Sequence, residues 1–239
     1  MKKLNELTQR EQTNLFSKLR ISFTHHSSAI EGISLSFGET QKLLEQGLTA
    51  PDKTIYEQLV VLGFADAFDL VVRKAYQDSE RLNAGLIKDI HYALFAKSLE
   101  VSPERTERPV GAWRTDERKI KGSNVSLSLP KSINQDIENL LYQFNTEMDL
   151  QDISKFHIKF ERIHPFADGN GRVGRLVMAY QAIRNNYIPP LILNERRKQY
   201  LNSFEDSSRM TEYLKECIQE SLNIIDNGLN QSQGFKMGL

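Results

Sequence analysis

Several features are scarce in this chain of 239 residues, and each absence narrows the possibilities. The single cysteine, Cys217, excludes an internal disulfide framework and a cysteine-rich zinc site, and it is consistent with a reducing compartment. Proline and glycine number only 7 and 13, which favours helices. The longest apolar stretch, Leu59 to Ala65, is far shorter than the ~20 residues that a membrane-spanning helix needs.

Net charge is also absent, because 31 basic and 31 acidic side chains cancel. Bulk binding of nucleic acid or anionic lipid needs excess positive charge, so we expect neither as a partner, although a local basic pocket stays possible. The first twelve residues contain two lysines without an apolar core after them, which argues against a secretory signal. We therefore expect a soluble, cytoplasmic globular protein.

The spacing of the apolar residues predicts an all-α fold. Ser36 and Glu39 form the pattern of a capping box, and Asn83 is a second expected helix cap. Between Pro103 and Pro130, proline, glycine and serine interrupt short β-branched stretches, which predicts a loop with a small β-hairpin. The expected helices cover about 11–30, 36–47, 52–77, a segment from Asn83, a segment opened by Ser132 and Gln135, 151–162, 171–185, 195–206 and 210–226.

One segment combines residues that suit chemistry on a phosphate. Residues 160–175 read FERIHPFADGNGRVGR. His164 stands where a helix is expected to end, so its imidazole can face a cleft. Asp168 is a hard oxygen ligand of the kind that magnesium shares with substrate phosphates. Each residue alone has an ordinary reading, a helix-end histidine and a turn aspartate.

The residues that follow favour anion binding. Gly169, Asn170 and Gly171 lead into a helix whose first N–H groups are free to bind an anion. Arg172 and Arg175 are three apart and project from one side of its first turn, and guanidinium groups bind phosphate in a bidentate manner. The stretch 157–175 has four basic and two acidic residues, a local charge of +2. Together these features predict a magnesium–polyphosphate site beside a titratable base.

The run from His164 to Arg175 resembles the full signature of Fic-domain proteins, HPFxDGNGRxxR. Most members transfer AMP from ATP to a hydroxyl of a protein and release pyrophosphate. The resemblance implies a Fic-type helical bundle with a small β-hairpin flap, ATP as co-substrate and Mg²⁺ as cofactor. Relatives that transfer phosphate instead have a lysine near Gly171-Arg172, so the retained pair favours AMP transfer.

The resemblance also implies a role for each matching residue. His164 would be the base that takes the proton of the target hydroxyl, for which its intrinsic pKa is suited. Phe166 would anchor the loop in the core. The ligand-binding roles would be Asp168 for magnesium, Asn170 with the backbone of Gly169 and Gly171 for the α-phosphate region, and Arg172 and Arg175 for the outer phosphates.

Two further segments extend the resemblance. Residues 108–125 resemble the stretch that leads into the flap, with Ile120 expected to clamp the target side chain and Lys121 and Gly122 at the pairing edge and turn. An ordinary surface hairpin is the alternative reading. Residues 187–200 resemble the segment after the catalytic helix, which would place Tyr200 near the adenine.

Ser27 to Gly32 resembles the inhibitory motif of the family, Ser/Thr-x-x-x-Glu-Gly. Ser27 and Glu31 are four apart and so share a helical face. A carboxylate at Glu31 could pair with Arg175 and compete with the γ-phosphate for it. The alternative is an exposed carboxylate at a helix end. Ile33 departs from the family, where asparagine is common at this position.

The expected organisation is an N-terminal helix with the inhibitory motif (1–35), a Fic-type catalytic domain (36–226) and a polar tail (227–239). The leading hypothesis is an autoinhibited protein adenylyltransferase that acts on an unknown protein and on itself. The alternatives are a deAMPylase that uses Glu31 to position water, and a catalytically quiet nucleotide-binding module. A homodimer is possible. His91 is expected to be structural, and His157 has no evident metal partners.

Overall fold

The computed structural model describes residues 2–77, 81–119 and 125–234, without the side chains of 77 and 225–234. Within these ranges the chain forms nine α-helices, four short 3₁₀ helices and no β-strand, and a single antiparallel bridge joins Lys3 to Tyr187. The predicted all-α class is confirmed. The α-helices are α1 (Gln9–Ile30), α2 (Phe37–Gln46), α3 (Ile55–Gln77), α4 (Ala84–Val101), α5 (Ile133–Gln143), α6 (Leu150–Ile163), α7 (Asn170–Arg184), α8 (Arg197–Asn202) and α9 (Ser207–Gly234).

Local signals set several helix ends where we predicted them. The Ser36 side chain accepts from the backbone N–H of Glu39, whose carboxylate accepts in return from the Ser36 backbone. Gly47 ends α2 in the left-handed conformation, with φ 68°. Asn83 caps α4 by accepting from the Leu86 N–H at 2.8 Å.

Other boundaries differ from the prediction for local reasons. Helix α3 starts at Ile55 and not near 52, because the Thr54 hydroxyl accepts from the Glu57 N–H and acts as the cap. Ser132 makes no capping hydrogen bond, because a 3₁₀ turn over Pro130–Ser132 leads directly into α5. The predicted cap at Ser132 is therefore wrong.

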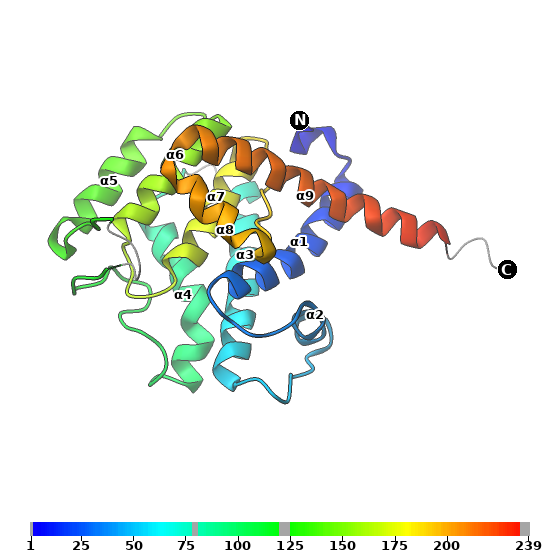
Figure 1. Ribbon diagram of the computed structural model, residues 1–239, viewed down its shortest axis with the longest axis horizontal. Coiled ribbons are helices and arrows are strands. Elements are labelled where there is room, and N and C mark those ends of the chain that lie inside the picture. Colours follow the sequence, from blue (N-terminus) through cyan, green and yellow to red (C-terminus); the bar gives the residue numbers. More distant parts are fainter. Residues whose placement is uncertain (1, 78–80, 120–124, 235–239) are drawn as a thin grey trace.

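The C-terminal third also differs in its helix ends. The stretch expected as one helix over 195–206 is a 3₁₀ turn at Asn194–Arg196, then α8, then a second turn at Ser203–Glu205. Helix α9 continues to Gly234, beyond the predicted end at 226. In Figure 1 its last turns project away from the rest of the molecule.

The expected β-hairpin flap is not seen: residues 103–119 and 125–129 contain no strand. Ile120, Lys121 and Gly122 lie outside the described residues. The buried side chain of Arg114 instead joins the two ends of this segment, since its Nη1 donates to the Asp116 carbonyl at 2.5 Å and its Nη2 to the Ser128 carbonyl at 2.6 Å. A side chain thus satisfies carbonyl groups that a strand ladder would have used.

Helix α7 runs through the middle of the fold and packs against α3, α4 and α6 (Figure 1). Every residue from Val173 to Ile183 is buried, so this helix is enclosed on all sides. Helices α3 and α4 approach so closely that a Cβ on Gly63 would lie 2.1 Å from the Leu94 carbonyl oxygen. The packing around α7 fixes the position of its N-terminus, where the signature residues lie.

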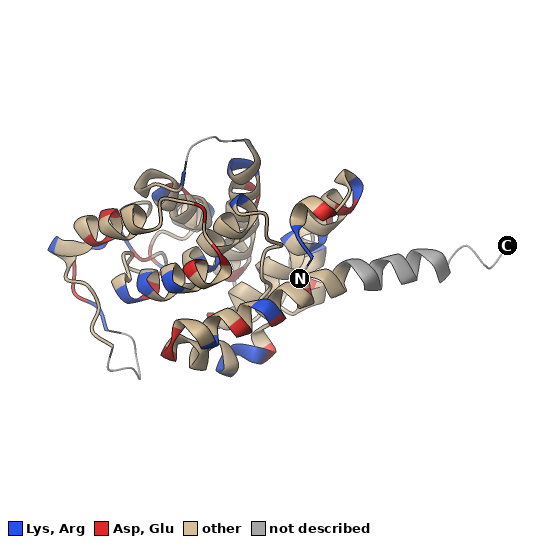
Figure 2. Ribbon diagram, turned by 90° about the horizontal axis from the view of Figure 1, so that it is seen from above, with Lys and Arg blue, Asp and Glu red and all other residues tan. Residues whose placement is uncertain are grey.

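The surface carries charges of both signs, and Figure 2 shows basic and acidic residues interspersed along the helices. None of the helices in the described part of the chain combines the length and apolar character that crossing a membrane requires.

Candidate active site

His164 occupies an unusual backbone position at the end of α6. It has φ 52°, in the left-handed region, and its N–H bonds to the Phe160 carbonyl at 3.0 Å. Its Nδ1 lies 3.3 Å from the Glu161 carbonyl, which favours a proton on Nδ1 and leaves Nε2 as an acceptor. Burial lowers the pKa of His164, so the imidazole is neutral near neutral pH.

The loop after His164 is held closed by its own side chains. Phe166 is fully buried, as predicted for a loop anchor. The Asn170 side chain donates to the Phe166 carbonyl at 2.9 Å and accepts from its N–H at 2.8 Å. Asn170 therefore braces the loop, and its role at the α-phosphate region stays a prediction.

Two residues from other parts of the chain support the same loop. His91 stacks on the Phe166 ring at 3.9 Å, and its Nε2 lies 3.1 Å from the Asp168 carbonyl. Arg114 donates through Nε to the His164 carbonyl at 2.8 Å and through its backbone N–H to the Pro165 carbonyl at 2.9 Å. The structural role expected for His91 is present, whereas no signal in the sequence indicated this role for Arg114.

Arg172 and Asp168 form an ion pair within the signature itself. Nη2 of Arg172 lies 3.1 and 3.0 Å from the two carboxylate oxygens. The guanidinium carbon is 4.9 Å from the centre of the Phe95 ring, which adds a cation–π contact. Gly169 is required here, because it has φ 78° and a Cβ would lie 2.6 Å from that ring.

Arg175 is held by α1. Its Nε donates to the Ser27 hydroxyl at 2.7 Å, and its Nη2 donates to the Ser27 carbonyl at 3.1 Å and to the Glu31 carboxylate at 2.8 Å. The structure thus contains the predicted ion pair between Glu31 and Arg175. Burial acts to raise the pKa of Glu31, but the charges of Arg175 and Arg172 outweigh it, so the pKa is lowered and the group is a carboxylate.

The Glu31 carboxylate lies over the first turn of α7. A Cβ on Gly171 would be 2.5 Å from Glu31 Oε1 and 3.0 Å from Arg175 Nη1. The N–H groups of residues 170–172 have no partner within the helix, since the first α7 bond runs from Val173 to the Gly169 carbonyl. An anion was expected at this helix end, and in the structure the negatively charged group that lies there is the Glu31 carboxylate of the same chain.

Asp168 suits the way magnesium is usually bound. Its side chain is 38% exposed at the mouth of this loop, and one carboxylate plus substrate phosphates is a common magnesium ligand set. In the part of the chain that the structure describes, no three His, Cys, Asp or Glu side chains gather as an all-protein metal site. The residues present therefore fit a shared, substrate-dependent metal ion.

Tyr200 lies in a buried environment. It is only 2% exposed, and its hydroxyl is 2.7 Å from Nε2 of His157, which is itself buried. Arg175 lies on the other side, with its guanidinium carbon 5.8 Å from the tyrosine ring centre. Tyr200 thus packs behind Arg175, and its expected place near an adenine stays a prediction.

Glu161 is a half-buried acid whose Oε1 atom is fully buried, and the sequence did not single it out. Its Oε1 has no hydrogen-bond partner among the described residues, and a Cβ on Gly174 would lie 2.2 Å from it. Burial raises the pKa of Glu161 to about 8, which keeps the carboxyl group protonated at neutral pH. Its position three residues before His164 was the available signal, but nothing in the sequence indicated its burial.

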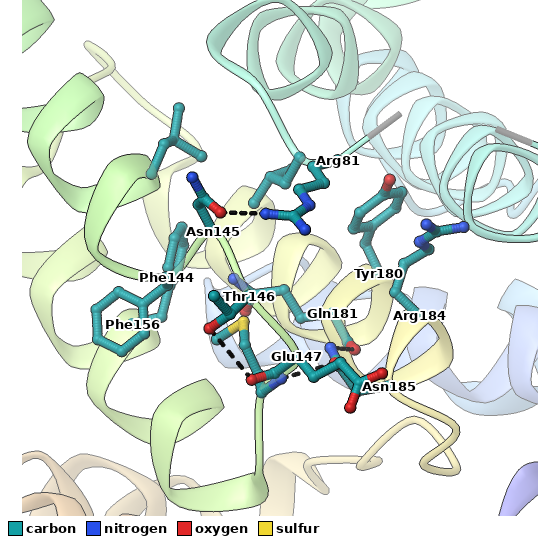
Figure 3. Close-up of a pocket in the computed structure, with 13 residues that line it drawn as sticks. Arg81, Phe144, Asn145, Thr146, Glu147, Phe156, Tyr180, Gln181, Arg184 and Asn185 are labelled. Carbon is teal, nitrogen blue, oxygen red and sulfur yellow. Dashed lines mark hydrogen bonds between the residues drawn. The ribbon is translucent and has the colours of Figure 1, made fainter. Parts of the chain in front are cut away.

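A separate cavity of about 250 Å³ lies near the other end of α7, beside Gln181 and Arg184 (Figure 3). It is roughly 17 to 21 Å along the helix from Asn170. Figure 3 shows Arg81 and Asn145 pointing toward each other across its rim. This cavity includes none of the signature residues.

Comparisons with known proteins match a segment of the chain that includes the N-terminus of α7. Residues 81–182 match the Fic/DOC family. Protein adenylyltransferase fic-1 of Caenorhabditis briggsae is 28% identical over 192 residues, covering 76% of this chain and 35% of that protein. The chain thus spans little more than a third of this relative.

Solved structures share the fold. A Fic-domain signaling protein of Bacteroides thetaiotaomicron is 20% identical, with a TM-score of 0.80 over 93% of this chain and 92% of that one. The BepC protein of Bartonella tribocorum, solved with bound AMPPNP, is 18% identical, with a TM-score of 0.50 over 72% of this chain and 90% of that one.

Proposed function

We propose that the chain transfers AMP from ATP to a Ser, Thr or Tyr hydroxyl of a protein, because residues 81–182 match the Fic/DOC family and the chain is distantly similar to protein adenylyltransferases. One observation carries the proposal. A neutral His164, whose Nε2 can accept a proton, is followed six residues later by the N-terminus of α7, where an anion can bind. The bound AMPPNP of the BepC structure supports a nucleotide as the ligand of this fold. The target protein is unknown, and the chain itself is one candidate.

In the proposed reaction, His164 Nε2 takes the proton of the target hydroxyl while its oxygen forms a bond to the α-phosphorus of ATP. The bond between the α-phosphorus and the bridging oxygen breaks, and pyrophosphate leaves with that electron pair. Arg172, Arg175 and the free N–H groups of α7 stabilise the negative charge on the phosphates. Arg114 and His91 keep the His164 loop in place for this transfer.

Asp168 would hold the magnesium ion of this reaction. Bound magnesium would neutralise phosphate charge. Arg172 already orients the Asp168 carboxylate through two contacts, so the ligand is held in place before a nucleotide arrives.

We further propose that the structure corresponds to an inhibited state. Glu31 is charged, lies over Gly171 and binds the guanidinium that would otherwise hold the γ-phosphate. A negative charge there repels an outer phosphate, so ATP would bind in a position unsuited to in-line attack. Glu31 precedes the signature in the same chain, and the inhibition would be intramolecular.

The reverse reaction is a second candidate, and the position of Glu31 favours it specifically. A carboxylate over the phosphate end of α7 could orient a water molecule toward the phosphorus of an AMP-modified protein. Removal of AMP would then depend on Glu31, whereas addition of AMP would be limited by it. A module that only binds nucleotide has no need of the base His164.

The test is to incubate wild type and Glu31→Gly with magnesium and ATP labelled at either the α- or the γ-phosphate. We expect protein labelling from α-labelled ATP only, mainly with Glu31→Gly, and its loss when His164→Ala is added. Glu45→Gly, at an exposed carboxylate near the end of α2, is the matched control and should behave as wild type. Labelling from the γ-phosphate would contradict AMP transfer.

A target protein that already carries AMP distinguishes addition of AMP from its removal. If Glu31 positions water, wild type releases AMP from it and Glu31→Gly does not. Release that is unaffected by Glu31→Gly would exclude the hydrolytic role.

A further inference from the structure

His91, on α4, lies directly behind the loop that carries Asp168. It is 1% exposed, and its ring stacks on the Phe166 ring with 3.9 Å between the ring centres and 4° between the planes. Both ring nitrogens have a hydrogen-bond partner: Nδ1 accepts from the Gly111 N–H at 2.8 Å, and Nε2 lies 3.1 Å from the Asp168 carbonyl oxygen. The ring thus joins two segments that are distant in the sequence.

The two partners of His91 fix the position of its proton. A backbone N–H can only donate, so the contact with Gly111 leaves Nδ1 without a proton. The single proton of the ring is then on Nε2, and it is donated to the Asp168 carbonyl, which can only accept. The opposite tautomer would set donor against donor at Gly111 and acceptor against acceptor at Asp168, and both groups would lose their partner.

The hydrogen bond from His91 holds one peptide group in place, the one between Asp168 and Gly169. Its carbonyl accepts from His91, and its N–H, which belongs to Gly169, donates to Asp168 Oδ1 at 2.6 Å. The Asp168 carboxylate is bound in this way to a peptide group whose orientation His91 sets. Arg172 contacts the same carboxylate from the side of α7. The candidate magnesium ligand is therefore oriented by a buried ring as well as by an arginine.

The Gly111 end of this contact is constrained as well. Gly111 has φ 70°, a backbone conformation that L side chains rarely adopt, and a Cβ there would lie 3.1 Å from the Tyr92 Cβ. Three residues later, Arg114 Nε donates to the His164 carbonyl at 2.8 Å. The segment that starts at Gly111 therefore supports the signature loop through two side chains, His91 and Arg114.

We propose that His91 is a positioning residue for the metal ion of the reaction: its Nε2–H form fixes the peptide between Asp168 and Gly169 and thereby the direction of the Asp168 carboxylate. The inference rests on the proposed function, because it assumes that Asp168 binds magnesium together with the phosphates of ATP. In this role His91 does not touch the nucleotide. It acts on the affinity for the metal ion, whereas His164 acts on the proton of the target hydroxyl.

The test compares His91→Gln with His91→Asn, each added to the Glu31→Gly protein as the parent. The terminal nitrogen of glutamine can take the place of Nε2 and donate to the Asp168 carbonyl, whereas the terminal oxygen of asparagine can take the place of Nδ1 and accept from Gly111. Each variant loses one hydrogen bond, but only His91→Asn loses the one to Asp168. A merely structural role of the ring predicts the same result for both variants.

Mn²⁺ serves as the probe for the metal ion. It is titrated into the complex of the protein, in excess, with α,β-methylene ATP, which cannot release AMP, and electron paramagnetic resonance measures the free ion. We expect the Kd for Mn²⁺ to rise about tenfold in His91→Asn and to stay within about twofold of the parent in His91→Gln, because residues that orient a metal ligand contribute about 10- to 100-fold to metal affinity. The Kd for the nucleotide without metal should be the same in all three proteins.

Two further measurements separate positioning from stability. Ile137→Val, at a fully buried residue of α5 that makes none of these hydrogen bonds, is the control for a general loss of stability and should leave the Kd for Mn²⁺ unchanged. Nitrogen-15 chemical shifts of His91 in the parent, which do not depend on how the variants fold, should show a protonated Nε2 and an unprotonated Nδ1. The Nε2 signal should shift when Mg²⁺ is added to the nucleotide complex.

The outcomes distinguish this inference from the proposed function. The positioning role is excluded if the two His91 variants weaken Mn²⁺ binding equally, if neither does, if Ile137→Val has the effect of His91→Asn, or if the His91 proton is on Nδ1. If the parent binds Mn²⁺ with the nucleotide but transfers no AMP, the proposed function fails and the positioning role stands on the Kd values. A parent that transfers AMP without a metal ion would exclude the positioning role and leave the proposed function intact.

Discussion

The two arginines of the signature, Arg172 and Arg175, resemble each other closely and differ in one respect. Both are buried on the same helix, with side chains 5% and 3% exposed, and each pairs with a carboxylate that is about one third exposed. Arg172 pairs with Asp168, four residues earlier, whereas Arg175 pairs with Glu31 from another helix, 144 residues away. One pair therefore forms wherever the loop and helix form, and the other can be broken by moving α1.

Because of this difference, two arginines only three residues apart on α7 depend on different parts of the chain. The local pair orients the candidate magnesium ligand and involves no residue of α1. The remote pair makes the availability of Arg175 depend on the packing of α1. Under the proposed inhibition, Glu31 would leave Arg175 while Arg172 stays paired with Asp168.

The largest expected effect comes from removing each arginine in the Glu31→Gly background. Arg172→Met should lower kcat for AMP transfer about 10²- to 10³-fold, because it removes a phosphate donor and the partner of Asp168 together. Arg175→Met should act mainly through KM for ATP, by about 10- to 100-fold. Steady-state kinetics over ATP concentration separates the two effects.

Arg20→Met is the control for that experiment, since Arg20 pairs with Asp69 on a partly exposed surface of α1 and α3. It should leave both kinetic constants unchanged. Equal losses of kcat for Arg172→Met and Arg175→Met would remove the distinction between the two pairs.

The next effect concerns Gly171 and Gly174, each of which directly precedes one of these arginines and leaves no room for a Cβ. Gly174→Ala would place a Cβ 2.2 Å from Glu161 Oε1 and 3.1 Å from the His157 ring, within the buried interior. We expect a loss of about 1–3 kcal/mol in the free energy of unfolding, as is typical of overpacking. Gly171→Ala meets the ends of two side chains at the mouth of the site, Glu31 Oε1 and Arg175 Nη1, and should cost less. Chemical denaturation measures both, and the reverse order would contradict the assignment.

A smaller effect is expected from breaking the remote pair. Glu31→Gly leaves Arg175 buried without its carboxylate, and because Glu31 is 36% exposed we expect a loss of about 1–2 kcal/mol, or roughly 3–6 °C in Tm. Magnesium and ATP should raise Tm more in Glu31→Gly than in wild type, because ligand binding stabilises the folded state in proportion to affinity. Differential scanning calorimetry provides the measurement, and equal ligand-induced shifts would argue against competition between Glu31 and ATP.

The last effect is a dependence of stability on pH that comes from Glu161 and concerns neither arginine directly. Its pKa is raised from 4.5 to about 8 in the folded chain, so the folded state binds more protons than the unfolded state between these values. Stability should therefore fall as pH rises from about 4.5 to about 8. Glu161→Gln cannot ionise, so its free energy of unfolding should fall less than that of wild type as pH rises. The difference in stability between variant and wild type should therefore shift in favour of the variant from pH 5 to pH 8. Parallel stability curves would show that Glu161 does not titrate in this way.

The elements that could be predicted from the sequence are those set by neighbours along the chain. The Ser36–Glu39 capping box and the Gly47 helix end follow from local hydrogen bonds and from a positive φ, and both are present. The predicted cap at Ser132 failed for an equally local reason, the preceding turn at Pro130. The helical class was predictable because apolar periodicity reports which face of each helix is buried.

The contacts that could not be predicted depend on elements far apart in the chain. Arg114 was visible only as one residue in an expected approach to a hairpin, but its guanidinium bonds to His164, Asp116 and Ser128. Tyr200 was expected beside an adenine because of its place after the catalytic helix. In the structure its hydroxyl lies 2.7 Å from His157 Nε2 on α6, a contact that no local pattern indicated.

The sequence by itself determined the helical class and the two ends of α2, at Ser36 and Gly47, because hydrogen bonds between residues a few positions apart and a positive φ fix such ends locally. Tertiary structure alone decided which groups surround Arg175. Ser27, Glu31 and Tyr200 reach it from α1 and α8, and their distances are set by how these helices pack against the enclosed helix α7. Close packing fixes such positions to within an ångström, and no local pattern in the chain specifies them.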